Sequence, residues 1–181
     1  MLTRAQVTKN DTLLITGASG GVGSAAIQLA KARGARVIAV AGDKKKHSVR
    51  DAGADQALVR GASLEAALGE NSVDVVIDLV GGEDWPELLT ILTPFGRYAV
   101  SGAIAGPIVE LDLRTLYLKD QRFLGCTVLD DGVFSRLVGL IEEGDLKPLL
   151  ARSFALEALS EAQAFFLDKQ FRGKLVIDMA L

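Results

Sequence analysis

The stretch TGASGGVG, residues 16–23, lies between an apolar run at 13–15 and a segment of helical periodicity at 21–34. A glycine-rich turn that follows a strand and opens a helix is the setting of a dinucleotide-binding fingerprint. The pattern Gly-x-Gly-x-x-Gly is not matched literally. No Gly-Lys-Ser/Thr follows, so a P-loop is excluded. A tight turn without a ligand is the alternative, although such a turn does not need this much glycine.

Each glycine of this turn has a physical use. Gly17 and Gly20 permit backbone angles that other residues avoid. Gly21 lets the main chain approach a pyrophosphate, whose charge is stabilised by free N–H groups at the helix N-terminus. Gly23 lets the helix pack closely on the strand. The stretch therefore predicts a strand, a turn and a helix that together hold a dinucleotide.

The rest of the first 129 residues alternates between strands and helices. Apolar runs predict strands at 12–16, 36–40, 56–59, 73–80, 96–102 and 122–128. Helices are predicted at 21–34, at 44–52 with Asp43 as N-cap, at 85–92 and at 113–120. This alternation predicts an α/β fold, a Rossmann-type doubly wound parallel six-stranded sheet in the order 3-2-1-4-5-6.

The pattern changes at about residue 130. A helix at 133–144, capped by Asp130-Asp131, precedes an extended piece, a helix at about 160–169 and a closing strand at 174–178. We therefore expect two parts: a dinucleotide-binding core at 1–129 and a C-terminal extension at 130–181.

Composition narrows the class of protein. Hydrophobic residues make up 49% and charged residues 24%, and the net charge is −3, so neither nucleic acid nor a membrane is an expected partner. The single cysteine, Cys126, excludes a disulfide within the chain and a cysteine-based zinc site. No run approaches the roughly 18 apolar residues of a membrane span. We expect a cytoplasmic protein without a bound metal.

The end of the second predicted strand bears on the choice of nucleotide. An NAD site usually has an acidic residue there, about 20 residues past the turn, to bind the ribose 2′-hydroxyl. Here Ala41 takes that position, and three lysines follow at 44–46. Space and positive charge suit a 2′-phosphate, so NADP(H) is the predicted cofactor. Asp43 is the discordant residue, and its predicted capping role accounts for it.

Several segments together resemble the zinc-independent quinone oxidoreductases of the medium-chain dehydrogenase/reductase superfamily. The turn, VDVVIDLVGG (73–82), LTPFGRYAVSGAIAG (92–106), FLGCTVL (123–129) and FRGKLVIDM (171–179) follow that family in order and spacing. The resemblance covers nearly the whole chain. It implies the cofactor-binding domain of such an enzyme without the catalytic domain that precedes it in the family.

The resemblance also implies which residues contact the cofactor. It places the pyrophosphate at the turn, the 2′-phosphate beyond the second and third strands, and the nicotinamide end at the fourth to sixth strands. The implied residues are Ser19, Gly20, Gly21, Val22, Gly23, Gly42, Lys46, Arg60, Leu79, Val80, Gly81, Ser101, Gly102, Ala103, Phe123 and Gly125, with Cys126 beside the last. Relatives often have tyrosine where Arg60 stands.

The short-chain dehydrogenases are the competing family, because TGASGGVG fits their turn as well. Their chemistry needs Tyr-x-x-x-Lys, in which the lysine lowers the tyrosine pKa. Tyr98 is followed four residues later by Gly102, and Tyr117 by Gln121, so neither pair is suitable. An atypical short-chain dehydrogenase remains a further alternative.

No side chain is predicted to be catalytic, since the cofactor carries the hydride. His47 is expected at the surface, Cys126 in the core, and Asp74 and Asp78 at the ends of a buried strand. The expected function is NADPH-dependent reduction of a quinone, enone or enoyl thioester as part of a larger enzyme, with the isolated chain inactive. The alternative is a non-catalytic NAD(P)-binding sensor or interaction module.

The strand at 122–128 is also expected to form a homodimer. Its apolar, unbroken sequence would leave open backbone donors at the sheet edge for a second copy. Relatives of the family pair in this way, which the resemblance implies.

Overall fold

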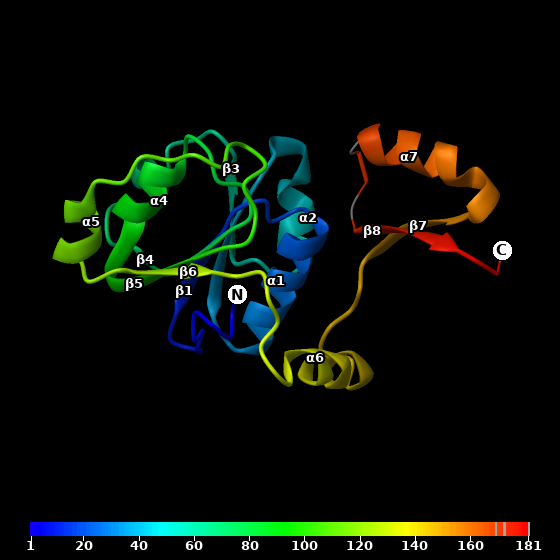
Figure 1. Ribbon diagram of the computed structural model, residues 1–181, viewed down its shortest axis with the longest axis horizontal. Coiled ribbons are helices and arrows are strands. Elements are labelled where there is room, and N and C mark those ends of the chain that lie inside the picture. Colours follow the sequence, from blue (N-terminus) through cyan, green and yellow to red (C-terminus); the bar gives the residue numbers. More distant parts are fainter. Residues whose placement is uncertain (169, 172, 181) are drawn as a thin grey trace.

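Six parallel strands form the centre of the computed structural model, which describes residues 1–168, 170–171 and 173–180 (Figure 1). The strand order is β3-β2-β1-β4-β5-β6, which confirms the predicted topology. The strands are β1 (Thr12–Ile15), β2 (Arg36–Ala41), β3 (Gln56–Val59), β4 (Val73–Asp78), β5 (Leu92–Val100) and β6 (Arg122–Gly125). Because the order reverses between β1 and β4, a crevice opens at their carboxyl ends.

Helices cover both faces of this sheet, as a parallel sheet requires (Figure 1). One face carries α1 (Gly21–Ala32) and α2 (Lys46–Asp51), together with the N-terminal segment. The other carries α3 (Leu64–Leu68), α4 (Trp85–Ile91) and α5 (Leu113–Leu118).

The two faces have separate hydrophobic cores. Successive side chains of a strand point to opposite faces. Accordingly, Leu13 and Ile15 of β1 lie in the core beneath α1, while Leu14 lies in the core beneath α4. All three are fully buried. The apolar run that precedes the glycine turn is therefore fully buried at the sheet's centre, and it fixes the position of the turn.

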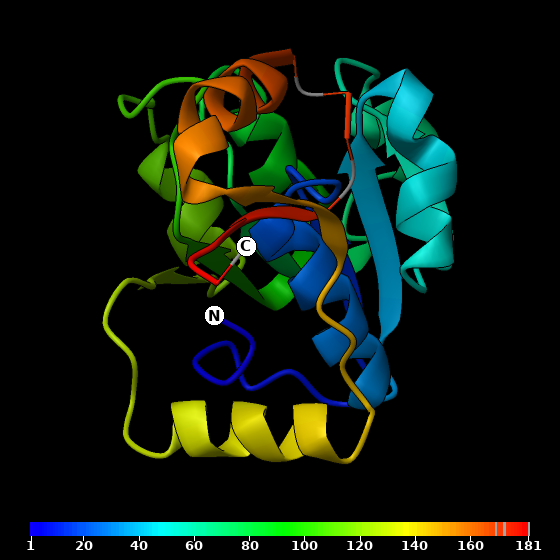
Figure 2. The same cartoon turned by 90° about the vertical axis from the view of Figure 1, so that its right-hand side faces the viewer.

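The C-terminal part forms a second, smaller layer. It contains α6 (Val133–Glu142), β7 (Leu150–Ala155), α7 (Leu159–Asp168) and β8 (Lys174–Asp178). β7 and β8 pair in parallel with each other and not with the main sheet. Figure 2 shows α6 lying beside the lower end of α1, whereas β8 crosses the other end of that helix.

Several predicted boundaries differ from the structure. β4 ends at Asp78 and β6 at Gly125, two and three residues earlier than predicted, while β5 begins at Leu92 rather than 96 and ends at Val100. The apolar residues beyond β4 and β6 belong to loops. The short helix α3, whose N-cap Ser63 accepts a hydrogen bond from the Ala66 N–H, was not predicted.

Two predicted helix caps are wrong. Asp43 begins a 3-10 turn at 43–45, and its carboxylate lies 3.3 Å from the Lys46 ammonium instead of capping α2. Asp130 forms an ion pair of 2.7 Å with Arg4, while Gly132 is the N-cap of α6 and no side chain caps that helix. In both places a cation within reach binds the carboxylate more strongly than a single backbone N–H would.

Candidate dinucleotide-binding site

The glycine turn connects β1 to α1 by a tight path. Gly17 has a φ of +58°, which favours glycine. A Cβ at Gly23 would overlap the Gly17 carbonyl and the backbone of Ala18, so Gly23 allows the close packing that was predicted. Gly20 has an ordinary extended conformation, with φ −75° and ψ 173°, so the predicted need for special angles there is wrong.

The first turn of α1 can hold an anion. The N–H groups of Gly21, Val22 and Gly23 have no hydrogen bond within the part of the chain that the structure describes, and the first bonded one is the Ser24 N–H, which donates to the Gly20 carbonyl. Such free donors and the helix dipole favour negative charge. No acidic side chain lies in this turn to compete for them.

A lysine from the far end of the chain also reaches this turn. A Cβ at Gly21 would overlap the end of the Lys174 side chain, so the ammonium of the first residue of β8 lies against Gly21. Lys174 has no ion-pair partner among the described residues. Sequence analysis did not identify this residue as part of the site. A phosphate at this position would meet backbone donors and a cation together.

The loops after β4 and β5 come together beside the turn. A Cβ at Gly17 would contact Leu79 and Val80, and one at Gly102 would lie 2.6 Å from the Leu79 carbonyl oxygen. Gly81 forms a bridge with Gly106 in the next loop. The predicted nicotinamide-side residues at 79–81 and 101–103 are therefore adjacent in the structure.

A buried carboxylate fixes these loops. Asp78, at the end of β4, is 1% exposed. Its Oδ1 accepts hydrogen bonds from the Thr16 hydroxyl at 2.6 Å and from the Val80 N–H at 2.9 Å, and both oxygens accept from the Gly81 N–H. Together these bonds join the end of β1 to the loop after β4. At the other end of β4, Asp74 accepts from the backbone N–H of the first residue of β1, so the predicted role of both carboxylates at the strand ends is confirmed.

Tyr98 is the last partner of this carboxylate. Its hydroxyl donates to Asp78 Oδ2 at 2.5 Å. Burial, together with the hydrogen bond and the negative charge of Asp78, raises the pKa of Tyr98 far above its ordinary value. Tyr98 thus stays protonated and serves the structure, which agrees with the absence of a tyrosine–lysine pair.

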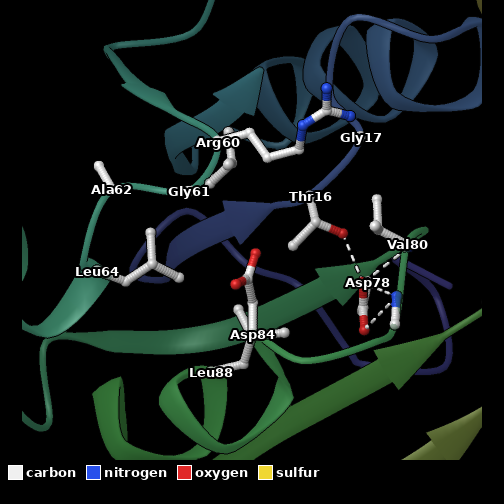
Figure 3. A pocket seen from close by; sticks show the side chains of 12 residues that line it. Thr16, Gly17, Arg60, Gly61, Ala62, Leu64, Asp78, Val80, Asp84 and Leu88 are labelled. Atoms are coloured by element: carbon white, nitrogen blue, oxygen red, sulfur yellow. Dashed lines mark hydrogen bonds between the residues drawn. The ribbon is translucent and has the colours of Figure 1, made fainter. Parts of the chain in front are cut away.

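A pocket lies at the crevice between β1 and β4 (Figure 3). Its volume is about 400 Å³, including the part open to solvent. It is bounded by the ends of β1 and β2, by the segment after β3 and by the start of α4. Its lining residues are Thr16, Gly17, Val40, Arg60, Gly61, Ala62, Leu64, Asp78, Val80, Gly81, Asp84 and Leu88.

Of the predicted 2′-phosphate residues, Arg60 lines this pocket, whereas Gly42 and Lys46 are not among its lining residues. Figure 3 shows the Arg60 guanidinium pointing toward Gly17. Gly42 follows β2, and a Cβ there would have nothing within 4 Å. Lys46 is partly neutralised by Asp43, and the Lys45 ammonium donates to the Phe171 carbonyl at 3.3 Å. Of these cations, Arg60 lines the pocket and has no partner of its own among the described residues.

The residues predicted on β6 lie apart from the turn. The Phe123 ring packs edge-on against Trp85 and Tyr98, with centroids 5.8 and 5.6 Å away, inside the core beneath α4. Gly125 ends the strand, and Cys126 is buried as predicted. A second hollow, about 1040 Å³ with its open part, lies between α1, α6 and the N-terminal segment, and Val22 and Ser101 line it.

The part of the chain that the structure describes has no group of three or more His, Cys, Asp or Glu side chains that could hold a metal. His47 is exposed, as predicted. None of the described helices has the length and apolarity to cross a bilayer.

The fold and the glycine turn together identify the class of domain. A parallel sheet in this order, with an anion-binding glycine turn at its switch point, is a Rossmann dinucleotide-binding domain. The family model described as zinc-binding dehydrogenase matches residues 21–143. The chain belongs to this family, and it is the NAD(P)-binding part of a medium-chain dehydrogenase/reductase.

Curated relatives and a solved structure agree with this assignment. An acryloyl-coenzyme A reductase of Metallosphaera sedula is 35% identical over 178 residues, which are 97% of this chain and 53% of the relative. The quinone oxidoreductase-like protein 2 of Bos taurus is 31% identical over 97% of this chain and 55% of its own length. The chain therefore spans about half the length of these relatives.

The solved structure is that of a protein described as an alcohol dehydrogenase from Sinorhizobium meliloti 1021. It has a TM-score of 0.90 and 50% identity, over 98% of this chain and 51% of the other. The resemblance inferred from the sequence is thus confirmed, and the relatives are oxidoreductases.

Proposed function

We propose that this chain is the NADPH-binding domain of an oxidoreductase that reduces a quinone, an enone or an enoyl thioester by hydride transfer. The observation that carries the proposal is the anion site of α1. There the Lys174 ammonium and three N–H groups without a hydrogen bond among the described residues adjoin the loops after β4 and β5. The names of the relatives, a quinone oxidoreductase-like protein and an acryloyl-coenzyme A reductase, support the acceptor classes.

The cofactor would lie along the carboxyl edge of the sheet. When bound, it supplies the hydride, and the protein binds and orients it. Ser19 to Gly23 and Lys174 would hold the pyrophosphate. The loops at 79–81 and 101–103, fixed by Asp78, would orient the nicotinamide ribose, with Phe123 and Gly125 at the nicotinamide end. Gly42, Lys46 and Arg60 would surround the 2′-phosphate.

A preference for NADPH over NADH follows from the end of β2. Ala41 supplies no carboxylate to pair with a free 2′-hydroxyl, and Arg60 offers an unpaired cation nearby. One charge-assisted contact contributes about 1.5–3 kcal/mol. Calorimetric titration with both dinucleotides tests the proposal directly. Equal affinities for NADPH and NADH would contradict it.

A carboxylate introduced at this point should reverse the preference, by repelling the phosphate and accepting from the free hydroxyl. Ala41→Asp is the direct substitution, but Ala41 is 4% exposed, so the variant also loses stability. Gly42→Asp is the second variant, because a Cβ there meets no atom within 4 Å. The ratio of the two affinities, rather than either one, is the readout.

The second candidate is a non-catalytic sensor of NAD(P). It is favoured by one observation: the Tyr98 hydroxyl, which lies beneath the loop at 79–81, donates to the buried Asp78 and so serves the structure rather than proton transfer. Hydride transfer needs donor and acceptor carbons held about 3–3.5 Å apart. We expect this chain by itself to oxidise NADPH with a simple quinone no faster than the protein-free mixture. A saturable rate above that background, lost in Gly21→Asp, would contradict this expectation.

We also propose how the chain is divided into parts and how two copies associate. Residues 1–129 would form the dinucleotide-binding core, and 130–181 an extension that contributes Lys174 to it. β6 is the edge strand next to β5, and we propose that two copies pair along it.

A further inference from the structure

The pocket of Figure 3 has opposite charges at its two ends. Arg60 and Asp84 both line it, yet they form no ion pair with each other or with any described residue. In Figure 3 the Asp84 carboxylate points into the pocket, between Leu64 and Thr16. The Arg60 side chain extends along the opposite border of the pocket, and its guanidinium points toward Gly17 of the glycine turn. A ligand that fits both ends has an anionic group near the turn and a hydrogen-bond donor at the far end.

The Asp84 carboxylate makes no hydrogen bond or ion pair with any described residue that would stabilise the fold. It is the residue before α4, where a carboxylate commonly caps the helix, but its side chain makes no capping hydrogen bond. The neighbouring Glu87 behaves differently, since it accepts from the Ser63 hydroxyl at 2.5 Å and from the Glu65 N–H at 3.1 Å. The Asp84 carboxylate is therefore free to accept a hydrogen bond from a ligand.

The walls between the two charges are apolar and firmly held. Val40, Leu64 and Leu88 line the pocket and are 7%, 4% and 1% exposed. Buried aliphatic side chains of this kind suit the faces of a flat, weakly polar ring. The pocket thus has an apolar floor that is open to solvent, with one acceptor at its far end.

We propose that Asp84 is a specificity residue that recognises adenine, by accepting a hydrogen bond from the exocyclic amine of the base. This assignment rests on the proposed function, which brings an adenine dinucleotide to the site. The base lies over the apolar floor at Leu64 and Leu88, on the open side of the pocket. Its amine donates to Asp84, and its ribose phosphate faces Arg60. An analogue with hypoxanthine has a carbonyl oxygen in place of the amine, and that oxygen would face the carboxylate.

The experiment compares NADPH with its hypoxanthine analogue, by calorimetric titration of the full chain. The wild-type protein should bind the analogue about tenfold more weakly, as expected for one hydrogen bond to a charged group. Asp84→Asn should weaken NADPH binding and strengthen binding of the analogue, because an amide can donate to the carbonyl as well as accept. The ratio of the two affinities should therefore fall toward one.

Glu83→Gln is the matched control. It removes the same charge from the neighbouring exposed residue, which does not line the pocket, and should leave the ratio as in the wild type. A general effect of net charge on phosphate binding would alter both variants and both ligands equally. Since Asp84 is exposed and unbonded, the variant retains every contact of the fold.

Two results would overturn the assignment alone: equal binding of both dinucleotides by the wild type, or an unchanged ratio in Asp84→Asn. A wild-type protein that binds neither dinucleotide would overturn the proposed function and this assignment with it.

Discussion

Replacing Tyr98 by phenylalanine tests the buried network beneath the site. The change removes the hydroxyl that donates to Asp78 Oδ2 at 2.5 Å, and it keeps the ring that packs against Trp85. A buried hydrogen bond to a charged group contributes about 1.5–3 kcal/mol. Because Asp78 retains the Thr16 hydroxyl and the two loop N–H groups, we expect a loss of about 2 kcal/mol, in the lower part of that range. That loss lowers Tm by about 4–8 °C in a chain of this size.

The same substitution has a distinct dependence on pH. Burial, followed by the hydrogen bond and the charge of Asp78, raises the pKa of Tyr98 in the folded protein. In the unfolded chain it ionises near pH 10. The stabilisation is therefore fully present below about pH 10 and is lost as the pH rises. At about pH 11 ionisation of the unfolded chain removes about 1.4 kcal/mol, so the difference between wild type and Tyr98→Phe should shrink to well below 1 kcal/mol.

Urea unfolding at near-neutral and alkaline pH measures this difference. All other titrating groups are common to both proteins, so their contributions cancel. Tyr117→Phe is the control, because Tyr117 is 61% exposed and has no hydrogen bond of its hydroxyl among the described residues. A difference between wild type and Tyr98→Phe that stays constant with pH would refute the reasoning, as would an equal loss in the control.

The remaining predictions concern the anion site and the sheet edge. Lys174→Ala should weaken NADPH binding about tenfold, since one cation near the phosphates is lost, and the affinity should then depend less on salt concentration. An affinity that calorimetric titration finds unchanged would contradict the assignment of Lys174. Gly21→Ala should weaken NADPH binding in the same assay, because the new methyl group overlaps the Lys174 side chain. Binding as tight as that of the wild type would show that Lys174 can move aside. Light scattering should show a dimer, and a monomer for Gly125→Pro. The Cys126 N–H donates to β5, so the Gly125 N–H faces away from β5, on the side where Arg4 donates to the Gly125 carbonyl. A dimeric Gly125→Pro variant would exclude pairing along β6.

The main sheet was predictable because each of its strands is a short apolar run between turns. Their ends were less predictable, because Leu79 and Val80 are as apolar as the strand before them yet form the loop that Asp78 holds. The short helix α3 has too few residues to show a period. Asp43 could not be assigned correctly, because local spacing fits a cap and an ion pair with Lys46 equally well.

The candidate site was predictable where its residues follow the strand ends in order. Lys174 and Asp84 were missed for different reasons. Lys174 lies far from Gly21 in the sequence, and only the crossing of β8 over α1 brings them together. Asp84 sits where a helix cap is expected, and its orientation into the pocket is a matter of side-chain geometry that no sequence pattern encodes.

The contact between Lys174 and Gly21 has a consequence for how this domain forms on the ribosome. Domains fold as the chain emerges, beginning with the N-terminal part. The main sheet is complete once β6, which ends at Gly125, has emerged, whereas Lys174 follows 49 residues later (174 − 125). A nascent chain can thus present the glycine turn and its free N–H groups before the lysine has been added. During that interval cofactor would be held weakly, and its capture would strengthen only as synthesis reaches β8.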